Sequence, residues 1–139
     1  MAKTFSAQID DIVKLTDAKI TAVIRQSVQE VVDIAQKPVA KGGKMRVDTG
    51  FLRASGQMSL NGMPTGPTRP ADDAKPGQYN FNSATVLLNL GNFKLGQTIH
   101  FGWTANYAIY REVYDGFLAS AVQQWPAIVA KNVNKVSKL

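Results

Sequence analysis

Cysteine is absent from this 139-residue sequence, and histidine occurs only once, at His100. These two absences exclude disulfide bonds, thiol nucleophiles, Cys/His zinc sites and any metal site that needs two histidines, and we predict no cofactor. The sequence also has no run of 18 or more apolar residues, so we predict no membrane-spanning helix and no membrane partner. The first six residues have no apolar core, and we expect no secretion signal. Stability must then come from packing within one chain or between copies.

The composition is that of a globular protein, with 45% hydrophobic and 19% charged residues, and the length fits one domain over 1–139. The net charge of +6 is unevenly distributed, because the stretch from Lys37 to Arg69 carries +5 of it with Asp48 as its only acid. A concentrated basic stretch indicates a nearby polyanion such as DNA. The alternative is a solvated loop that its lysines keep soluble.

The N-terminal segment is predicted to be one long helix over 6–36. Apolar residues recur there every three or four positions, at Ile9, Ile12, Val13, Ile20, Val23, Ile24, Val28, Val31 and Ile34. Thr4 or Ser6 suits the N-cap, and Pro38 prevents continuation. Such a helix is about 45 Å long, more than a globule of this size needs. We therefore expect part of its apolar stripe to contact another subunit, unless the helix bends over its own sheet.

Two segments are predicted to be loops. The basic loop, 37–47, contains Gly42 and Gly43 and is flexible by composition. The segment 62–78 contains four prolines and shows no apolar periodicity. A loop of this length inside a compact domain is usually functional or disordered. We interpret 62–78 as a flexible arm that becomes ordered only in an assembly.

The remaining segments predict strands and then helices. Alternating apolar residues predict a hairpin of strands 84–90 and 97–103, joined by the turn-forming residues 91–96, and a further strand is expected at 57–60. His100 falls on the polar face of its strand. A single histidine in a strand is most often solvated or hydrogen-bonded, so we predict no catalytic role for it.

Helical spacing follows over 105–115, with Gly116 as a C-cap, and over 117–136, which Pro126 should kink or restart. The order predicts an α+β fold. Its long N-terminal helix and C-terminal helices would pack on one face of a small antiparallel sheet, with a long Pro/Gly-rich loop.

The triplet Asp48-Thr49-Gly50 is the one motif that suggests catalysis, because aspartic proteases carry their catalytic carboxylate in it. Those enzymes pair two aspartates that share a proton. Here no apolar strand precedes the triplet, and the cations Lys44 and Arg46 beside Asp48 oppose a shared proton. The sequence contains neither the Gly-x-x-x-x-Gly-Lys phosphate loop nor the Gly-x-Gly-x-x-Gly dinucleotide-binding motif. We therefore predict a non-enzymatic protein without catalytic residues, keep the protease as a remote alternative, and interpret Asp48 or Thr49 as the cap of a short helix.

Two segments resemble one protein family. The residues 47–55, Val-Asp-Thr-Gly-Phe-Leu-Arg-Ala-Ser, are similar to the "V-D-T-G-x-L-R-x-S" signature of the tail-completion, or head–tail joining, proteins of long-tailed bacteriophages. The residues 107–116 resemble the downstream "Y-A-x-x-v-E-x-G" block of that family. The family usually continues with a threonine after this glycine and an arginine-proline near the last helix, which this sequence lacks. The subfamily therefore stays open between a neck component and a tail terminator.

The resemblance implies a structural virion protein, assembled in the host cytoplasm and located in the neck or tail. It would form a ring, commonly a homohexamer, between a head connector or stopper protein and a tail tube or terminator protein. Genomic double-stranded DNA would pass through the lumen without sequence-specific contacts. The alternative from the charge alone is a non-specific nucleic-acid-binding module, although no helix-turn-helix, RNP or zinc pattern is present.

Three groups of residues are the candidates for these roles. The candidates for the DNA lumen are Lys41, Lys44 and Arg46. The signature turn contains Asp48, Thr49, Gly50, Leu52 and Arg53. The candidates for a subunit interface are Tyr107, Tyr110, Glu112 and Tyr114, since tyrosine is enriched at interfaces. The tyrosines recur at helical spacing, so core packing beneath the sheet is an equal alternative for them.

Overall fold

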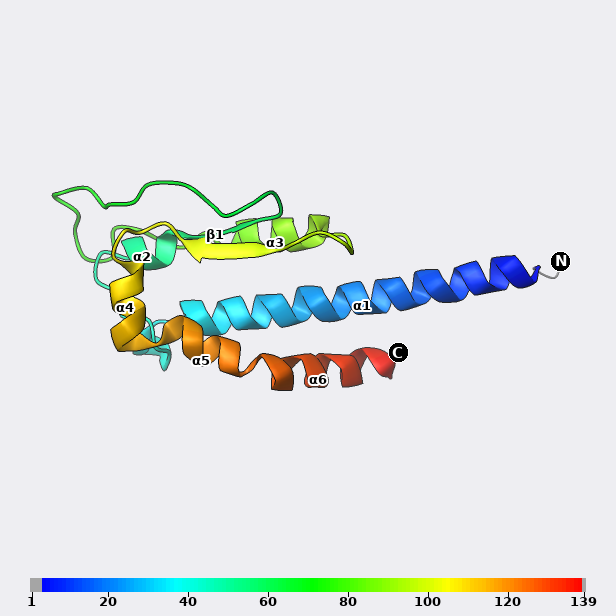
Figure 1. Cartoon of the computed structure of the whole chain (residues 1–139). Helices are drawn as coiled ribbons and strands as arrows, with labels where there is room; N and C mark the ends of the chain where they lie inside the picture. Colours follow the sequence, from blue (N-terminus) through cyan, green and yellow to red (C-terminus); the bar gives the residue numbers. More distant parts are fainter. Residues whose placement is uncertain (1–3, 139) are drawn as a thin grey trace.

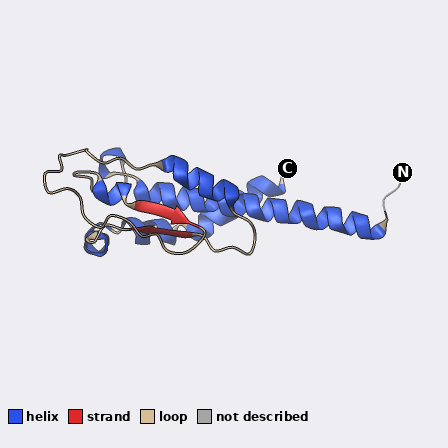
Figure 2. Ribbon diagram, turned by 90° about the horizontal axis from the view of Figure 1, so that it is seen from above, coloured by secondary structure: helices blue, strands red, loops and turns tan. Residues whose placement is uncertain are grey.

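The computed structural model describes residues 4–138, and it has the predicted α+β class (Figure 1). Its elements in chain order are α1 (Phe5–Gln36), the 3-10 helix η1 (Val39–Lys41), α2 (Phe51–Ala54), β1 (Gly56–Ser59), α3 (Ser83–Asn92), β2 (His100–Trp103), α4 (Ala108–Asp115), α5 (Phe117–Gln123) and α6 (Trp125–Ser137). The sheet and α3 lie on one side of α1, whereas α5 and α6 pack along its other side (Figures 1 and 2). The long helix is thus the central layer.

The predicted long helix and its boundaries are confirmed. Thr4 is the N-cap of α1, and its hydroxyl oxygen accepts a 3.2 Å hydrogen bond from the amide of Ala7. The helix ends one residue before Lys37, which is followed by Pro38. None of the described helices is both long and apolar enough to cross a membrane.

The predicted hairpin is wrong, because residues 84–90 lie within the helix α3. Val86 and Leu90, four residues apart, are its buried pair, while Leu87 and Leu88 are exposed. Asn82 accepts a 3.1 Å hydrogen bond from the amide of Ala84 and caps this helix. A short run rich in leucine fits both periods, and the cap with the four-residue spacing favours the helix here.

The strand β2 pairs with β1 instead, in an antiparallel register that places Gly56 opposite Trp103 and Ser59 opposite His100. The strand β1 lies one residue earlier than the predicted strand 57–60, and β2 begins three residues later than the predicted strand 97–103 and ends at the same residue. The C-terminal prediction is confirmed more closely, since Gly116 adopts a left-handed φ of 65° after α4. The last helix breaks at Gln124, and Pro126 lies in the first turn of α6.

Two apolar clusters form the core. The first contains Met45, Phe51, Leu52, Ala105 and Phe117. The second contains Val32, Met58, Val86 and Leu90. The first cluster joins the segments 45–52 and 105–117, which are about 60 residues apart in sequence, and the second joins α1, the sheet and α3.

Candidate functional site

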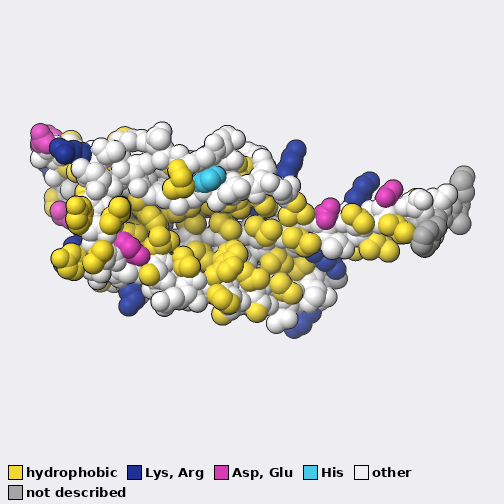
Figure 3. Space-filling model, viewed as in Figure 1, with side chains coloured by type: hydrophobic (Ala, Val, Ile, Leu, Met, Phe, Trp, Pro, Cys, Tyr) yellow, Lys and Arg dark blue, Asp and Glu magenta, His cyan; other side chains and the backbone are white. Residues whose placement is uncertain are grey.

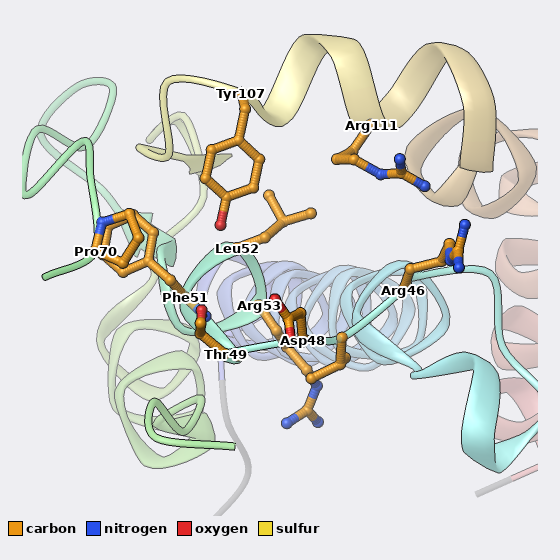
Figure 4. Close-up of a pocket in the computed structure, with 11 residues that line it drawn as sticks. Arg46, Asp48, Thr49, Phe51, Leu52, Arg53, Pro70, Tyr107 and Arg111 are labelled. Carbon is orange, nitrogen blue, oxygen red and sulfur yellow. The ribbon is translucent and has the colours of Figure 1, made fainter. Parts of the chain in front are cut away.

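The two motif segments meet in one cleft of about 550 Å³ (Figure 4). Its lining residues are Arg46, Val47, Asp48, Thr49, Gly50, Phe51, Leu52, Arg53, Pro70, Tyr107 and Arg111. The segment 46–53 supplies the signature turn, and Tyr107 and Arg111 come from the downstream block. The signature turn and the downstream block, which resemble the same family in sequence, are therefore neighbours in space.

The signature turn is built around Gly50, which precedes α2 with a left-handed φ of 87°. A Cβ atom at this position would lie 2.1 Å from the carbonyl oxygen of Tyr79, so only glycine fits. The predicted cap at Asp48 or Thr49 is wrong, because Gly50 occupies the N-cap and has no side chain that accepts a hydrogen bond. The Thr49 hydroxyl oxygen instead accepts a 3.2 Å hydrogen bond from the amide of Phe51. The Asp48 side chain is exposed.

Arg53 of the signature ties the turn to the end of α1. Its Nε donates a 2.7 Å hydrogen bond to the carbonyl oxygen of Gln36, and Gln36 Nε2 donates a 2.8 Å bond back to the carbonyl oxygen of Arg53. The buried Gln36 side chain also accepts a 2.8 Å bond from Trp103 Nε1. The Arg53 guanidinium lies 5.4 Å from the ring centroid of Phe81. Arg53 therefore joins α2 to α1, and Gln36 extends this network to β2.

Ser55, the last residue of the signature, is buried and joins the turn to the segment that follows β2. Its hydroxyl donates a 2.7 Å hydrogen bond to the carbonyl oxygen of Leu52 and accepts a 3.2 Å bond from the amide of Ala105. Sequence reasoning did not single out Ser55, Gln36 or Trp103 as site residues. The signature itself contained the signal for Ser55, whereas nothing in the spacing of Gln36 indicated a buried amide.

Tyr107 forms one wall of the cleft and is half-buried, with its hydroxyl directed toward the turn (Figure 4). Burial raises the pKa of Tyr107, and the negative charge of Asp48 adds to that rise. A hydrogen bond with the backbone of Leu52 lowers it. Tyr107 thus contacts the signature turn and lies outside α4, as the residue that precedes it.

The cleft is mainly positive. Arg46 is exposed and Arg111 half-buried, and both extend on the same side of the cleft (Figure 4). Arg111 forms a bidentate ion pair with Asp115, at 2.5 and 3.2 Å. Asp48 is the only acid in the lining. Within residues 4–138, no group of three or more His, Cys, Asp or Glu side chains lies together as a metal site would require.

The basic loop is a closed turn anchored by one buried side chain. Met45 is fully buried, and its carbonyl oxygen accepts a 2.9 Å hydrogen bond from the amide of Val39. The candidates Lys41, Lys44 and Arg46 are all exposed around this anchor. The buried Met45 fixes the turn, so the three basic side chains are held in solvent. Arg46 also lines the cleft.

The segment 62–78 contains no helix or strand and is hydrogen-bonded to the body at several points. The amide of Asn106 donates to the carbonyl oxygen of Thr68 at 2.8 Å, and the Thr104 hydroxyl donates to that of Pro67 at 2.8 Å. The amide of Gly77 donates to the carbonyl oxygen of Asp48 at 2.8 Å. The arm thus runs beside the cleft, and its ordering on assembly stays a prediction.

The helix α4 has an exposed apolar surface at the end of the molecule. Its residues are Ile109, Tyr110, Val113 and Tyr114, which are 70–80% exposed. Core packing is therefore excluded for Tyr110 and Tyr114, and the interface interpretation remains for them. Glu112 has a different role within the chain, since its carboxylate accepts 2.9 Å hydrogen bonds from the amides of Leu118 and Ala119 and caps α5.

A second apolar surface runs along the length of the molecule (Figure 3). It covers α1 between the sheet on one side and α5 and α6 on the other. Near α5 it forms a depression of about 150 Å³ lined by Val28, Val31, Val32, Ala35, Ile99, Phe101, Trp103, Leu118 and Trp125. Toward the end of α6 it forms a groove of about 420 Å³ lined by Lys19, Ile20, Val23, Ile24, Val129, Val133, Val136 and Ser137. Contiguous apolar surface of this kind is typical of protein interfaces.

Comparisons of the chain with protein-family models, with curated proteins and with solved structures found no match. The likeness to tail-completion proteins therefore remains a resemblance of the two motif segments. Those segments are the ones that form the cleft and its supporting hydrogen bonds.

Proposed function

We propose that this chain is a structural, non-enzymatic virion protein of a tailed phage. In this proposal it forms a ring in the neck, as a tail-completion or tail-terminator component, and joins the DNA-filled head to the tail. Its partners are further copies of itself, a head connector or stopper protein, and a tail tube or terminator protein. Duplex DNA passes through the lumen.

The observation that carries this proposal is the meeting of the two motif segments in the cleft. The signature turn and the downstream block are more than 50 residues apart in sequence, yet Tyr107 contacts Leu52 directly. Unrelated chance matches have no reason to be neighbours in the fold. Their contact supports the interpretation of both as parts of one motif, and through it the resemblance to head–tail joining proteins.

The distribution of apolar surface also supports an assembling protein. Val113 and Tyr114 are 77% and 80% exposed on α4, and the apolar face along α1 extends to the other end of the molecule. A monomer rarely exposes apolar patches of this extent. Two separate surfaces at different places on one subunit suit a ring, in which each subunit has two neighbours.

The basic loop supports the lumen assignment. Lys41, Lys44 and Arg46 are exposed, and symmetry would repeat these three charges once per subunit as a belt. Contacts to phosphates carry no sequence information, so such a belt allows DNA to slide.

A triple substitution of Lys41, Lys44 and Arg46 by glutamine tests the loop. We expect unchanged folding, because all three side chains are exposed, and impaired head–tail joining or DNA retention in filled heads. Fully infectious particles with this variant would make the loop a solvated connector. Tight binding of the wild-type chain to one DNA sequence at physiological salt would favour the nucleic-acid-binding module instead.

A further inference from the structure

The apolar stripe of α1 extends beyond the helix that covers it. Ile20 and Val23 line the groove with α6, whose last residue is Ser137 beside Lys19. The same stripe continues toward the N-terminus through Ile9, Ile12 and Val13, at the three- and four-residue spacing of one helix face.

This N-terminal half of α1 projects from the body (Figures 1 and 3). Ile9, Ile12 and Val13 are 43%, 64% and 51% exposed. The residues 5–18 span about 21 Å of helix at 1.5 Å per residue, which is about four turns. An isolated helix segment of this length is marginal in water, and its stability normally comes from packing of its apolar face. The exposed apolar stripe of the projecting half therefore favours a partner that offers an apolar groove.

The chain itself contains such a groove. The groove between α1 and α6 is lined almost entirely by aliphatic side chains, and Val133 is 47% exposed in it. It follows the axis of α1 beside the antiparallel α6, so a third helix laid along it would contact both. The apolar stripe on the projecting half matches this groove in chemistry, because both surfaces consist mainly of aliphatic side chains.

The charges beside the two surfaces are complementary. The projecting half, residues 5–18, has three aspartates and one lysine. The helix α6 and Lys138 after it contain three lysines and no acid. Among the described residues, Lys131 is paired with Glu30, whereas no ion pair is present at Lys135 or Lys138. Two projecting halves would repel each other, whereas a projecting half and the end of α6 attract.

We propose that the projecting half of α1 docks in the groove between α1 and α6 of a neighbouring copy. This proposal rests on the proposed ring, for which it supplies the contact between subunits. The donor and acceptor surfaces differ, so the contact is heterologous, and a heterologous contact closes into a ring when the rotation permits. Asp10 and Asp17, seven residues apart on one flank of the stripe, face the lysines that follow Val133.

Complementation between two variants tests this mode. The variant Ile12→Gln/Val13→Gln disables the projecting half, and Val133→Gln disables the groove; all three positions are exposed, so both variants should fold. Under the conditions in which the wild-type chain assembles, alone or on tail tubes, each variant alone should fail to assemble. An equimolar mixture should give a heterodimer, since one projecting half and one groove remain intact, and nothing larger. Leu15→Gln is the matched control, because Leu15 is 59% exposed but lies off the stripe, and it should assemble normally.

The outcomes separate the two proposals. Assembly of Val133→Gln alone, with failure of Ile12→Gln/Val13→Gln, would indicate pairing of two projecting halves and overturn this docking mode. Normal assembly of both variants would overturn it as well, and the ring would stand on another contact. A wild-type chain that stays monomeric both alone and with tail tubes or connector-bearing capsids would overturn the ring itself.

Cysteine cross-linking gives an independent measurement, because the chain has no native cysteine. The double variant Ile12→Cys/Val133→Cys should form intermolecular disulfides upon oxidation, in a ladder that ends at one closed species. The pair Leu15→Cys/Val133→Cys should cross-link much less. Equal cross-linking of both pairs would contradict the docking mode.

Discussion

The two ends of the molecule differ in how their side chains are satisfied. At the end with the cleft, residues of the signature have partners in their own chain: Arg53 bonds Gln36, Ser55 bonds Ala105, and the amide of Tyr79 donates to the carbonyl oxygen of Thr49. At the other end, the apolar stripe of α1 passes the last residue of α6 and remains exposed. The signature turn therefore stabilises the fold, whereas the exposed apolar stripe of α1, which we propose contacts another subunit, lies outside both motif segments.

Because of this difference, substitutions at the two ends should affect different properties of the protein. Changes at the cleft should lower the free energy of unfolding, and changes on the projecting half of α1 should leave it unaltered but alter assembly.

Gly50→Ala should lower the free energy of unfolding by about 2 kcal/mol or more. The added Cβ would lie 2.1 Å from the carbonyl oxygen of Tyr79, in addition to the cost of a left-handed backbone for alanine. Gly42→Ala is the matched control, because Gly42 has a φ of 89° and nothing within 4 Å of the added Cβ. It should cost only about 1 kcal/mol. Equal losses in chemical denaturation would show that the contact with Tyr79 is unimportant.

Gln36→Ala should cost about 2 kcal/mol, because it leaves the half-buried indole N–H of Trp103 and the carbonyl oxygen of Arg53 without their partner. Gln29→Ala, at a half-exposed position of the same helix, controls for helix propensity and should change stability by less than about 0.5 kcal/mol. Thermal unfolding of both variants measures the difference. If the two losses match, the network does not hold the cleft end together.

Glu112→Gln should cost about 1 kcal/mol, since the charged carboxylate accepts two amide hydrogen bonds at the start of α5. Asp72→Asn, an exposed carboxylate in the arm, should be neutral. The same substitution tests the interface prediction for Glu112. A stable variant that fails to assemble would place Glu112 at a subunit contact after all.

Acidification should weaken the contact of α1 with α6 by a small amount, about 0.5 kcal/mol. A hydrogen bond from Lys131 is the main cause that lowers the pKa of Glu30, and bonds with Gln26 and Asn132 add to it. A lowered folded pKa means that this stabilisation is present above the unfolded value and is lost as the pH falls through the folded pKa. Wild type should therefore lose more stability than Glu30→Gln between neutral pH and the acidic range below 4.5. If the stability of wild type and of Glu30→Gln changes with pH in parallel, the ion pair of Glu30 with Lys131 does not contribute to stability.

Ile12→Gln/Val13→Gln should leave the free energy of unfolding within about 0.5 kcal/mol of wild type when both are measured at a dilution that keeps the chain monomeric. The reason is that both side chains lie mostly in solvent. A loss as large as that of Gln36→Ala would mean that the projecting half folds back on its own chain. The proposed difference between the two ends would then disappear.

The sequence predicted most of the helices, because long amphipathic periods, the Thr4 cap, Pro38, Gly116 and Pro126 are local signals. It failed at 84–90, where a short leucine-rich run fits a strand as well as a helix, and the cap at Asn82 decides between them. The partner of β2 could not be found either, since strand pairing is a long-range choice and the apparent turn at 91–96 favoured the wrong neighbour.

The candidate site was predicted in part. Both cleft-forming segments were found by their resemblance to one family, but their contact with each other depends on the packing of Phe51, Leu52 and Phe117 in the core. The roles of single residues were harder to predict. Glu112 was predicted only as an interface residue, and its capping of α5 was missed, because the turn at Gly116 brings the first amides of α5 back to it. Its place at an interface stays a prediction.

The mass of the purified chain, alone and after mixing with tail tubes or connector-bearing capsids, tests the proposed function most directly. We expect a single closed oligomer of defined stoichiometry, either in solution or bound at the end of the tube or connector. A chain that remains monomeric in every mixture and binds neither structure would contradict a role as a neck ring.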